Sequence, residues 1–238
     1  MPLTYEDISP ACGHHIFTDA LFLHGYNMLI ADGLNNKQIL EICCGEGDLA
    51  AWIGTLGKAE VIGLDSTQLS LDRAREKYRE LRNVSFVFGD VANMQKIPSE
   101  SVDLIIGQAS MHHLTNNISG VSAECRRVLR PGGKLLFVFE PLGHNPIVAA
   151  IRGIRNSRAQ YVDESNLYYW IVEEFARNFH KYEIFPFSLL AYLCKGLPKK
   201  SRLSRRIYFL ANRIDQFIFK HCPASKKYAA NANICFWK

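Results

Sequence analysis

Apolar positions along this chain follow two rhythms, and each rhythm predicts a different element. Short apolar runs bounded by turn residues predict buried strands, which we expect at residues 38–42, 61–64, 84–88, 102–106, 134–139, 182–187 and 231–236. Apolar residues spaced three and four apart predict helices at 67–81, 118–129 and 201–221. Between 38 and 140 the strands alternate with helical patterns, which favours an α/β fold with a parallel sheet.

The segments on either side of this alternation read differently. Residues 1–35 have the pattern of a helical N-terminal cap, and an aromatic and basic segment without a strand signal is inserted after Glu140. The simplest organisation is one domain over 1–238, with a cap at 1–35, a core at 36–140, and a lid with the C-terminal strands and helix at 141–238.

The helix expected at 201–221 combines an apolar row with positive charge. The row contains Leu203, Ile207, Leu210, Ile214 and Phe217, and it most simply packs on the body of the protein. From residue 195 to the end the chain has eleven Lys or Arg residues and one acid, Asp215, whereas the remainder is mildly acidic. A solvated basic helix is one interpretation; an anionic membrane surface, or a lipid-linked or phosphorylated ligand, is the other.

Composition limits the class of protein. The chain has 238 residues, 48% of them hydrophobic, and no apolar run approaches the roughly 20 residues that a membrane span needs. The first residues include acids and do not have the layout of a secretory signal. The seven cysteines are scattered without a Cys-x-x-Cys pair, which is typical of a reducing compartment, so we expect a cytoplasmic location.

Candidate chemistry begins where the first strand ends. There the chain reads Glu41-Ile42-Cys43-Cys44-Gly45-Glu46-Gly47, and its glycines allow a sharp turn and a close approach to a ligand. A helix follows at once, so its first amides face the same ligand. Asp65 ends the second strand, where a carboxylate can accept hydrogen bonds from two ribose hydroxyls. Both features suit either S-adenosylmethionine or NAD.

The ends of the next two strands distinguish these cofactors. After the third strand, Asp90 and the backbone amide of Val91 offer the acceptor and the donor that an adenine ring needs. The fourth strand then continues into Gly107 and Gln108 at the same edge of the sheet.

Together these segments, with Met111-His112-His113-Leu114 and 129–133, resemble the class I S-adenosylmethionine-dependent methyltransferases of the small-molecule branch. The resemblance implies a Rossmann-like, doubly wound, mostly parallel sheet of seven strands whose last strand is antiparallel. It also implies S-adenosylmethionine as cofactor and S-adenosylhomocysteine as product. The implied cofactor-binding residues are Glu41 (for the methionine ammonium), Cys43, Gly45, Gly47, Asp65 (for the ribose), Ser66, Asp90 and Val91 (for the adenine), and Gln108. Two positions depart from the family pattern, since Cys43 replaces a usual glycine and Ser66 a usual apolar residue.

The expected reaction is in-line methyl transfer to a small molecule, by O- or N-methylation in metabolite, natural-product, lipid or sugar biosynthesis. A hydroxyl acceptor needs a general base, and histidine suits that role near neutral pH. His113 follows the fourth strand and His144 follows the fifth, so both are candidate catalytic residues; no metal site is expected.

Three alternatives remain open. A nucleic-acid methyltransferase would fit the basic C-terminal region, but Gly107-Gln108-Ala109-Ser110 is not the Asn/Asp-Pro-Pro-aromatic motif of enzymes that act on base amines. A non-catalytic binding module would keep the fold without turnover, and an NAD enzyme would use only the glycine turn. The expected partner is a small-molecule acceptor, anionic or lipid-linked, with peripheral membrane contact through the basic helix.

Overall fold

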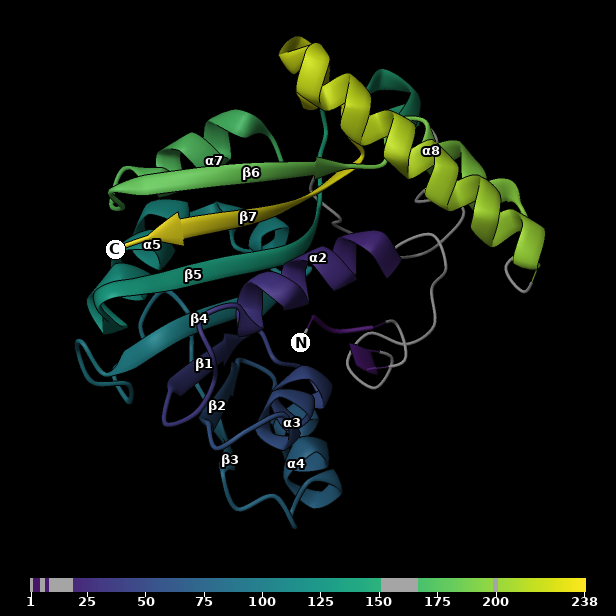
Figure 1. The fold of residues 1–238 in the computed structure, drawn as a ribbon. Helices are drawn as coiled ribbons and strands as arrows, with labels where there is room; N and C mark the ends of the chain where they lie inside the picture. The colour runs from purple at the N-terminus through teal and green to yellow at the C-terminus, as the bar shows by residue number, and fades with distance from the viewer. Residues whose placement is uncertain (1, 5–6, 9–18, 151–166, 199–200) are drawn as a thin grey trace.

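The computed structural model describes residues 2–4, 7–8, 19–150, 167–198 and 201–238. One seven-stranded sheet has the order β3-β2-β1-β4-β5-β7-β6 (Figure 1). Its strands are β1 Gln38–Ile42, β2 Glu60–Asp65, β3 Val84–Phe88, β4 Val102–Gln108, β5 Leu129–Pro141, β6 Lys181–Phe187 and β7 Asn231–Trp237. The α-helices are α2 Asp19–Ile30, α3 Asp48–Thr55, α4 Gln68–Lys77, α5 Ile118–Val128, α7 Tyr169–Ala176 and α8 Arg202–His221.

The sheet is parallel except at β7. The first five strands pair in parallel, whereas β7 runs antiparallel to both β5 and β6. The predicted doubly wound sheet with an antiparallel last strand is therefore confirmed. Strand order reverses between β1 and β4, and in such sheets ligands bind beyond the carboxyl ends of the strands at this reversal.

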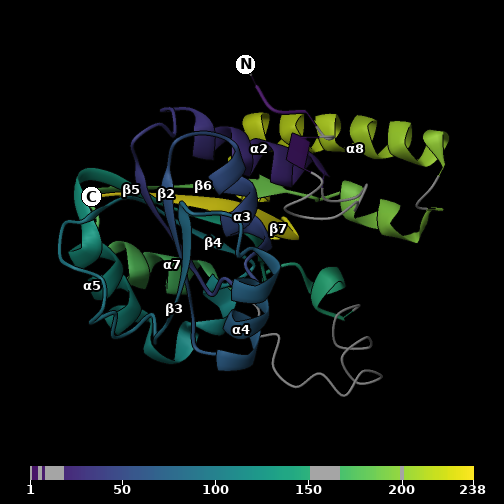
Figure 2. The same cartoon turned by 90° about the horizontal axis from the view of Figure 1, so that it is seen from below.

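Helices bury both faces of the sheet (Figure 2). On one face α5 and α7 pack over Leu40, Ile105 and Phe137, and on the other α2 and α3 pack over Ile39 and Ile106. Adjacent residues of a strand point to opposite faces, so a strand buried on both sides must be apolar throughout. This requirement explains why the central strands read as continuous apolar runs in the sequence.

The predicted elements are largely confirmed, and their ends differ by a few residues. The helix expected at 67–81 ends at Lys77, and the strand expected at 134–139 extends over Leu129–Pro141. The extension includes the Pro-Gly-Gly segment, where Gly132 has a φ of 76°. Backbone pairing with β4 therefore continues past residues that usually end an element. Of the inserted segment after Glu140, residues 151–166 lie outside the described residues, and the part that follows contains α7.

Helix α8 corrects one expectation. Its apolar row does not pack on the body, because Leu203, Leu210 and Phe217 are among its exposed residues. The buried residues are instead Ser204, Tyr208, Asp215 and Phe219. The cause is Asp215, whose carboxylate accepts hydrogen bonds from the backbone amides of Leu189, Leu190 and Ala191. That buried acceptor fixes the rotation of the helix, and the row faces outward. In the described residues no helix is long and apolar enough to span a membrane.

Candidate functional site

The turn after β1 has a backbone that demands special residues. Cys43, Gly45 and Gly47 all have positive φ values, of 55°, 53° and 78°. A Cβ on Gly47 would lie 2.3 Å from the Phe86 ring, so packing requires this glycine whatever the ligand. A Cβ on Gly45 would meet nothing within 4 Å. The turn is thus packed behind Gly47 and open at Gly45, where a ligand can approach the backbone.

Asp65 is tied to this turn. Its Oδ2 accepts a hydrogen bond from the Gly45 backbone amide at 2.8 Å, and its Oδ1 accepts one from the Thr67 amide, also at 2.8 Å. Ser66 lies between Asp65 and Thr67 in the sequence, and it is exposed. Each carboxylate oxygen has a second lone pair, so Asp65 can still accept from two hydroxyl groups. The structure therefore brings together the predicted residues Gly45, Asp65 and Ser66.

Glu41, the residue before the last one of β1, has a buried carboxyl group. Among the described residues its Oε2 has no hydrogen-bond partner. Burial raises the pKa of Glu41 to about 8, an effect that the Ala50 backbone amide partly opposes. A buried oxygen without a partner is unfavourable, and a donor or cation that reaches it would stabilise the charged form. Burial raises the pKa of the neighbouring Cys43 thiol to about 12, which disfavours the nucleophilic thiolate.

Asp90 and Val91 follow the end of β3, where the chain leaves the sheet. Asp90 is exposed, and its Oδ1 accepts a hydrogen bond from the Ala92 amide at 2.8 Å. The side chain of Val91 is buried in the core with Leu64 and Met94. The side chain of Val91 is therefore not available to a ligand, and its backbone amide stays the predicted contact.

The loop after β4 is anchored by a residue that the sequence analysis did not select. Glu140 is fully buried; its Oε1 accepts hydrogen bonds from the amides of Ser110 at 2.8 Å and Met111 at 2.9 Å. Its Oε2 lies 2.8 Å from Nδ1 of His112. A β-bulge in β5, with Phe139 at a φ of 65°, turns Glu140 toward this loop. The sequence feature that could have pointed to Glu140 is an acidic residue directly after the apolar run of residues 134–139.

His113 and Gln108 border this anchored loop. His113 is exposed, its backbone amide donates to the Ser110 carbonyl at 3.0 Å, and its ring lies 4.0 Å from that of His112. Gln108 accepts a hydrogen bond through Oε1 from the hydroxyl of Tyr26 on α2. Tyr26 is fully buried against Trp52, so it fixes the Gln108 side chain. No sequence signal had selected Tyr26.

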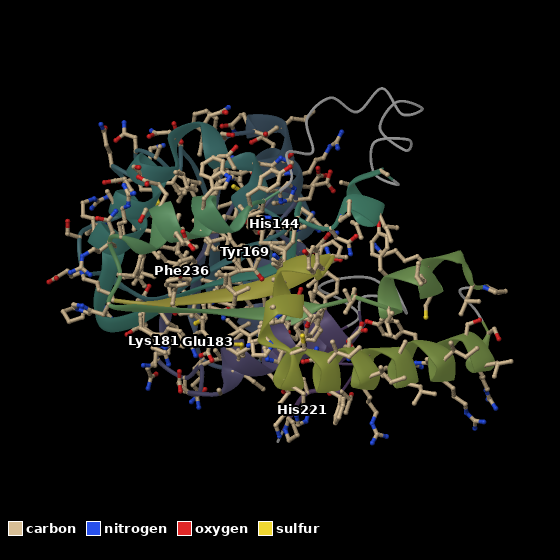
Figure 3. The ribbon with its side chains drawn as sticks, turned by 90° about the horizontal axis from the view of Figure 1, so that it is seen from above. His144, Tyr169, Lys181, Glu183, His221 and Phe236 are labelled. Carbon is tan, nitrogen blue, oxygen red and sulfur yellow. The ribbon has the colours of Figure 1, made fainter. Side chains whose placement is uncertain are left out.

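His144 lies in a different setting from His113. It borders a cavity of about 470 Å³ lined by Tyr169, Ile184, Pro223, Ala224, Lys226 and Lys227. Figure 3 shows His144 beside Tyr169, and its Nε2 accepts a hydrogen bond from the Tyr169 backbone amide at 3.0 Å. Burial and the nearby Lys227 lower the pKa of His144. Both effects favour the neutral ring, and one of its nitrogens already accepts a hydrogen bond from the backbone.

The described residues contain no group of three or more His, Cys, Asp or Glu side chains placed to hold a metal ion. What the structure gathers at one edge of the sheet is a glycine turn, three carboxylates and an anchored histidine loop. Parallel strands end at the same edge, so Glu41, Asp65, Asp90 and Gln108 share it.

Comparison with known proteins agrees with this geometry. Residues 39–133 match a family model described as a methyltransferase domain. The phthiotriol/phenolphthiotriol dimycocerosates methyltransferase of Mycobacterium tuberculosis is 35% identical over 118 residues, which are 49% of this chain and 42% of that protein. The sterol 24-C-methyltransferase of Pneumocystis carinii is 30% identical over 49% of this chain and 32% of that protein. The matched region thus spans less than half of either relative.

Solved structures share the fold. A phosphoethanolamine N-methyltransferase 2 of Haemonchus contortus, determined with phosphomonomethylethanolamine and S-adenosylhomocysteine, superposes with a TM-score of 0.59 at 16% identity over 99% of this chain and 59% of that one. The YcgJ protein of Bacillus subtilis gives 0.57 at 19% identity over 90% and 98% of the two chains. With the glycine turn, the strand-end carboxylates and the sheet order in place, the resemblance of this chain to the class I S-adenosylmethionine-dependent methyltransferases is confirmed, and it is carried by the methyltransferase domain match over residues 39–133.

Proposed function

We propose that this protein transfers the methyl group of S-adenosylmethionine to a small-molecule acceptor. The observation that carries the proposal is the buried Glu41 oxygen without a partner, next to the open turn at Gly45. A cationic methionine ammonium would supply the missing partner and would be attracted by the carboxylate. The nicotinamide cofactor NAD has no such group at the corresponding position, so this feature favours S-adenosylmethionine.

The remaining predicted residues divide the cofactor among them. Asp65 would accept from the ribose hydroxyls, with Ser66 beside it at the exposed rim. Asp90 and the Val91 amide would pair with the adenine. Cys43, Gly45 and Gly47 would give the turn its close approach, and the backbone at Gln108 would lie along the methionine portion.

The cofactor supplies a methyl carbon activated by a positive sulfur. The acceptor atom forms a bond to that carbon as the carbon–sulfur bond breaks, and the electron pair of the broken bond remains on sulfur. The protein must align the acceptor opposite the sulfur and exclude water. When the acceptor is a hydroxyl its proton must leave, and His113 is the exposed histidine on the anchored loop that would receive it.

His144 would contribute to acceptor binding more readily than to proton transfer. Its Nε2 is engaged by the Tyr169 amide, so only Nδ1 is available to another group. The cavity beside it has an apolar wall and carries Lys226 and Lys227. An acceptor with an apolar body and an anionic group fits that lining.

The acceptor class that we propose is a lipid-linked or anionic small molecule. Two of the relatives are named for dimycocerosates and for a sterol as acceptors, and a structural neighbour was determined with phosphomonomethylethanolamine. The basic character of α8 supports the same class. A cytoplasmic location of the single domain fits the described cysteines, none of which is paired in a disulfide.

Calorimetry and a transfer assay test the proposal in sequence. S-adenosylhomocysteine should bind to the full chain and NAD should not. Labelled S-adenosylmethionine, incubated with the protein and fractionated cell extract, should label lipid or small-molecule fractions. Binding of NAD alone would overturn the cofactor assignment. Cofactor binding without label in any fraction would favour a non-catalytic binding module, and label in nucleic acid would favour that alternative.

A further inference from the structure

The outward face of α8 is apolar along most of its length. Leu203, Leu210 and Phe217 are 66%, 59% and 64% exposed, and Ile207 and Ile214 lie between them at 41% and 42%. At 100° per residue these five side chains fall within an arc of about 80°. His221, at the end of the same row, lies against Phe217 with ring centroids 4.3 Å apart and ring planes tilted by 44°, and it points away from the sheet in Figure 3.

The apolar row cannot turn inward without the loss of buried contacts on the opposite side of α8. Asp215 is fully buried and holds three backbone amides of the segment before and within Ala191–Gly196. Tyr208 and Phe219 are buried on the same side. Rotation of α8 that buried the row would expose Asp215's partners and remove both aromatic rings from the core. The structure therefore presents the apolar row to the exterior as part of the stable fold.

Positive charge lies along the free side of this row. Arg202, Arg206, Arg213 and Lys220 are exposed, and at 100° per residue they follow one another beside the row. In the described part of the chain, these four side chains form no ion pair. The helix has one acidic residue, and Asp215 is buried away from this face. The exposed face is thus purely apolar and cationic.

We propose that this face of α8 docks on an anionic lipid surface. Apolar side chains would enter the boundary between head groups and acyl chains, while the arginines and lysine contact lipid phosphates. A high density of cations beside exposed leucine and phenylalanine is complementary to such a surface, whereas a protein partner would need an acidic counterpart around its apolar contact. Leu193, on the Ala191–Gly196 segment packed against α8, is 66% exposed and adds to the apolar area.

Docking would also position the sheet edge. The N-terminal half of α8 extends beyond the carboxyl ends of the parallel strands (Figures 1 and 2). That edge carries Asp65, Asp90 and the loop with His113. If the acceptor is lipid-linked, docking would bring it to this edge directly from the membrane. This step rests on the proposed function. The docking itself requires no methyl transfer and is tested without it.

Flotation of the full chain with vesicles tests the proposal. Vesicles of phosphatidylglycerol with phosphatidylcholine are compared with vesicles of phosphatidylcholine alone, at low salt and at about 0.15 M ionic strength. We expect binding to the anionic vesicles, weakened but not abolished by salt. Equal binding to both vesicles, or binding to neither, would overturn the proposal.

Matched variants separate the two contributions. The triple variant R202Q/R206Q/R213Q should weaken binding to anionic vesicles by about a hundredfold, at roughly 1 kcal/mol per cation. A control with the same change of charge, K58Q/R79Q/R82Q, should bind like the parent protein, since these exposed residues lie near β2 and α4. Equal losses in both triple variants would show attraction by net charge alone and would overturn the surface assignment.

The apolar row is tested independently of charge. Leu210→Ser and Phe217→Ser should each weaken vesicle binding by about tenfold or more. Leu69→Ser on α4, where the parent side chain is 62% exposed, is the matched control and should have no effect. Because all three side chains are exposed, thermal melting should be unchanged. Sedimentation velocity without lipid tests the competing occupant: a dimer that Leu210→Ser dissociates, together with absent vesicle binding, would identify the row as a contact between two copies.

Discussion

Nδ1 of His112 lies 2.8 Å from Oε2 of Glu140, and both side chains are buried. The same carboxylate accepts hydrogen bonds from the backbone amides of Ser110 and Met111. One side chain therefore holds the loop after β4 in place. His113 is the next residue on that loop and is exposed. The position of the candidate base therefore depends on a buried acid that anchors the residues before it.

Glu140→Ala should destabilise the protein by about 3–5 kcal/mol, because it leaves three backbone amides and a buried imidazole without their acceptor. Glu140→Gln keeps the shape and one acceptor oxygen, so its loss should be smaller. The free energy of unfolding, measured in urea, distinguishes them. An unchanged value for Glu140→Ala would show that water or rearrangement replaces the network.

Asp65→Ala should weaken binding of S-adenosylhomocysteine by about 1.5–3 kcal/mol, roughly tenfold to a hundredfold, through loss of charged hydrogen bonds to the ribose. Titration calorimetry measures this. Asp72→Ala on α4 removes an exposed carboxylate of the same type and should leave the affinity unchanged. Parent-like affinity of a folded Asp65→Ala variant would refute the ribose assignment.

The pH dependence of stability should depend on Glu41. Its pKa rises from 4.5 in the ordinary state to about 8 in the fold, so the folded state holds the proton more tightly than the unfolded state does. The associated stability is fully present below pH 4.5 and is lost as the pH rises toward 8. Glu41→Gln stays neutral, so near pH 9 it should be more stable than the parent by a few kcal/mol, on the order of 3. Denaturation curves at pH 5 and pH 9 test this, and parallel pH profiles for both proteins would contradict it.

Ligand binding should release that proton. A cationic ammonium at Glu41 favours the ionised carboxyl group and lowers its pKa, so binding near pH 7 should expel up to one proton. Calorimetry of S-adenosylhomocysteine binding in buffers of different ionisation enthalpy counts it. Glu41→Gln should bind more weakly and release less. Equal proton release by both proteins would remove Glu41 from contact with the ammonium.

His113→Ala should reduce turnover by about 10²–10⁴-fold while cofactor affinity stays near that of the parent protein, as expected for a general base. His144→Ala should instead raise the KM for the acceptor, since His144 borders the cavity with Lys226 and Lys227. Steady-state kinetics with any labelled acceptor fraction separates these effects. Normal turnover in His113→Ala would limit that residue to a structural role.

The strand pattern, the glycine turn and the strand-end acids could be predicted because each has a local cause. Burial on both faces makes a strand apolar throughout, and a turn with positive φ favours glycine, as at Gly45 and Gly47. Cys43 has a φ of 55°, so glycine would also suit this position. These requirements are readable from neighbouring residues alone.

What could not be predicted depends on contacts between distant segments. The bulge at Phe139 reverses the face of the sheet to which Glu140 points. The surrounding sequence has no pattern that predicts this bulge. Asp215 binds amides about 25 residues away and thereby decides which side of α8 is buried. An apolar row usually marks the buried side of a helix. Here three hydrogen bonds to one carboxylate reverse that rule.

Strand β6 lies at one edge of the sheet, and an open strand edge can pair with a strand of another molecule. β6 pairs only with β7 among the described strands, so its other side offers backbone groups to any passing strand. Pro186 within it has no amide hydrogen, and Gln216 of α8 donates to the Pro186 carbonyl at 3.1 Å. Lys181 and Glu183 add charges that repel apolar strands. Helix α8 thus shields an aggregation-prone edge on one side while its other side stays apolar. Deletion of α8 should therefore uncover the edge of β6 and cause the protein to aggregate.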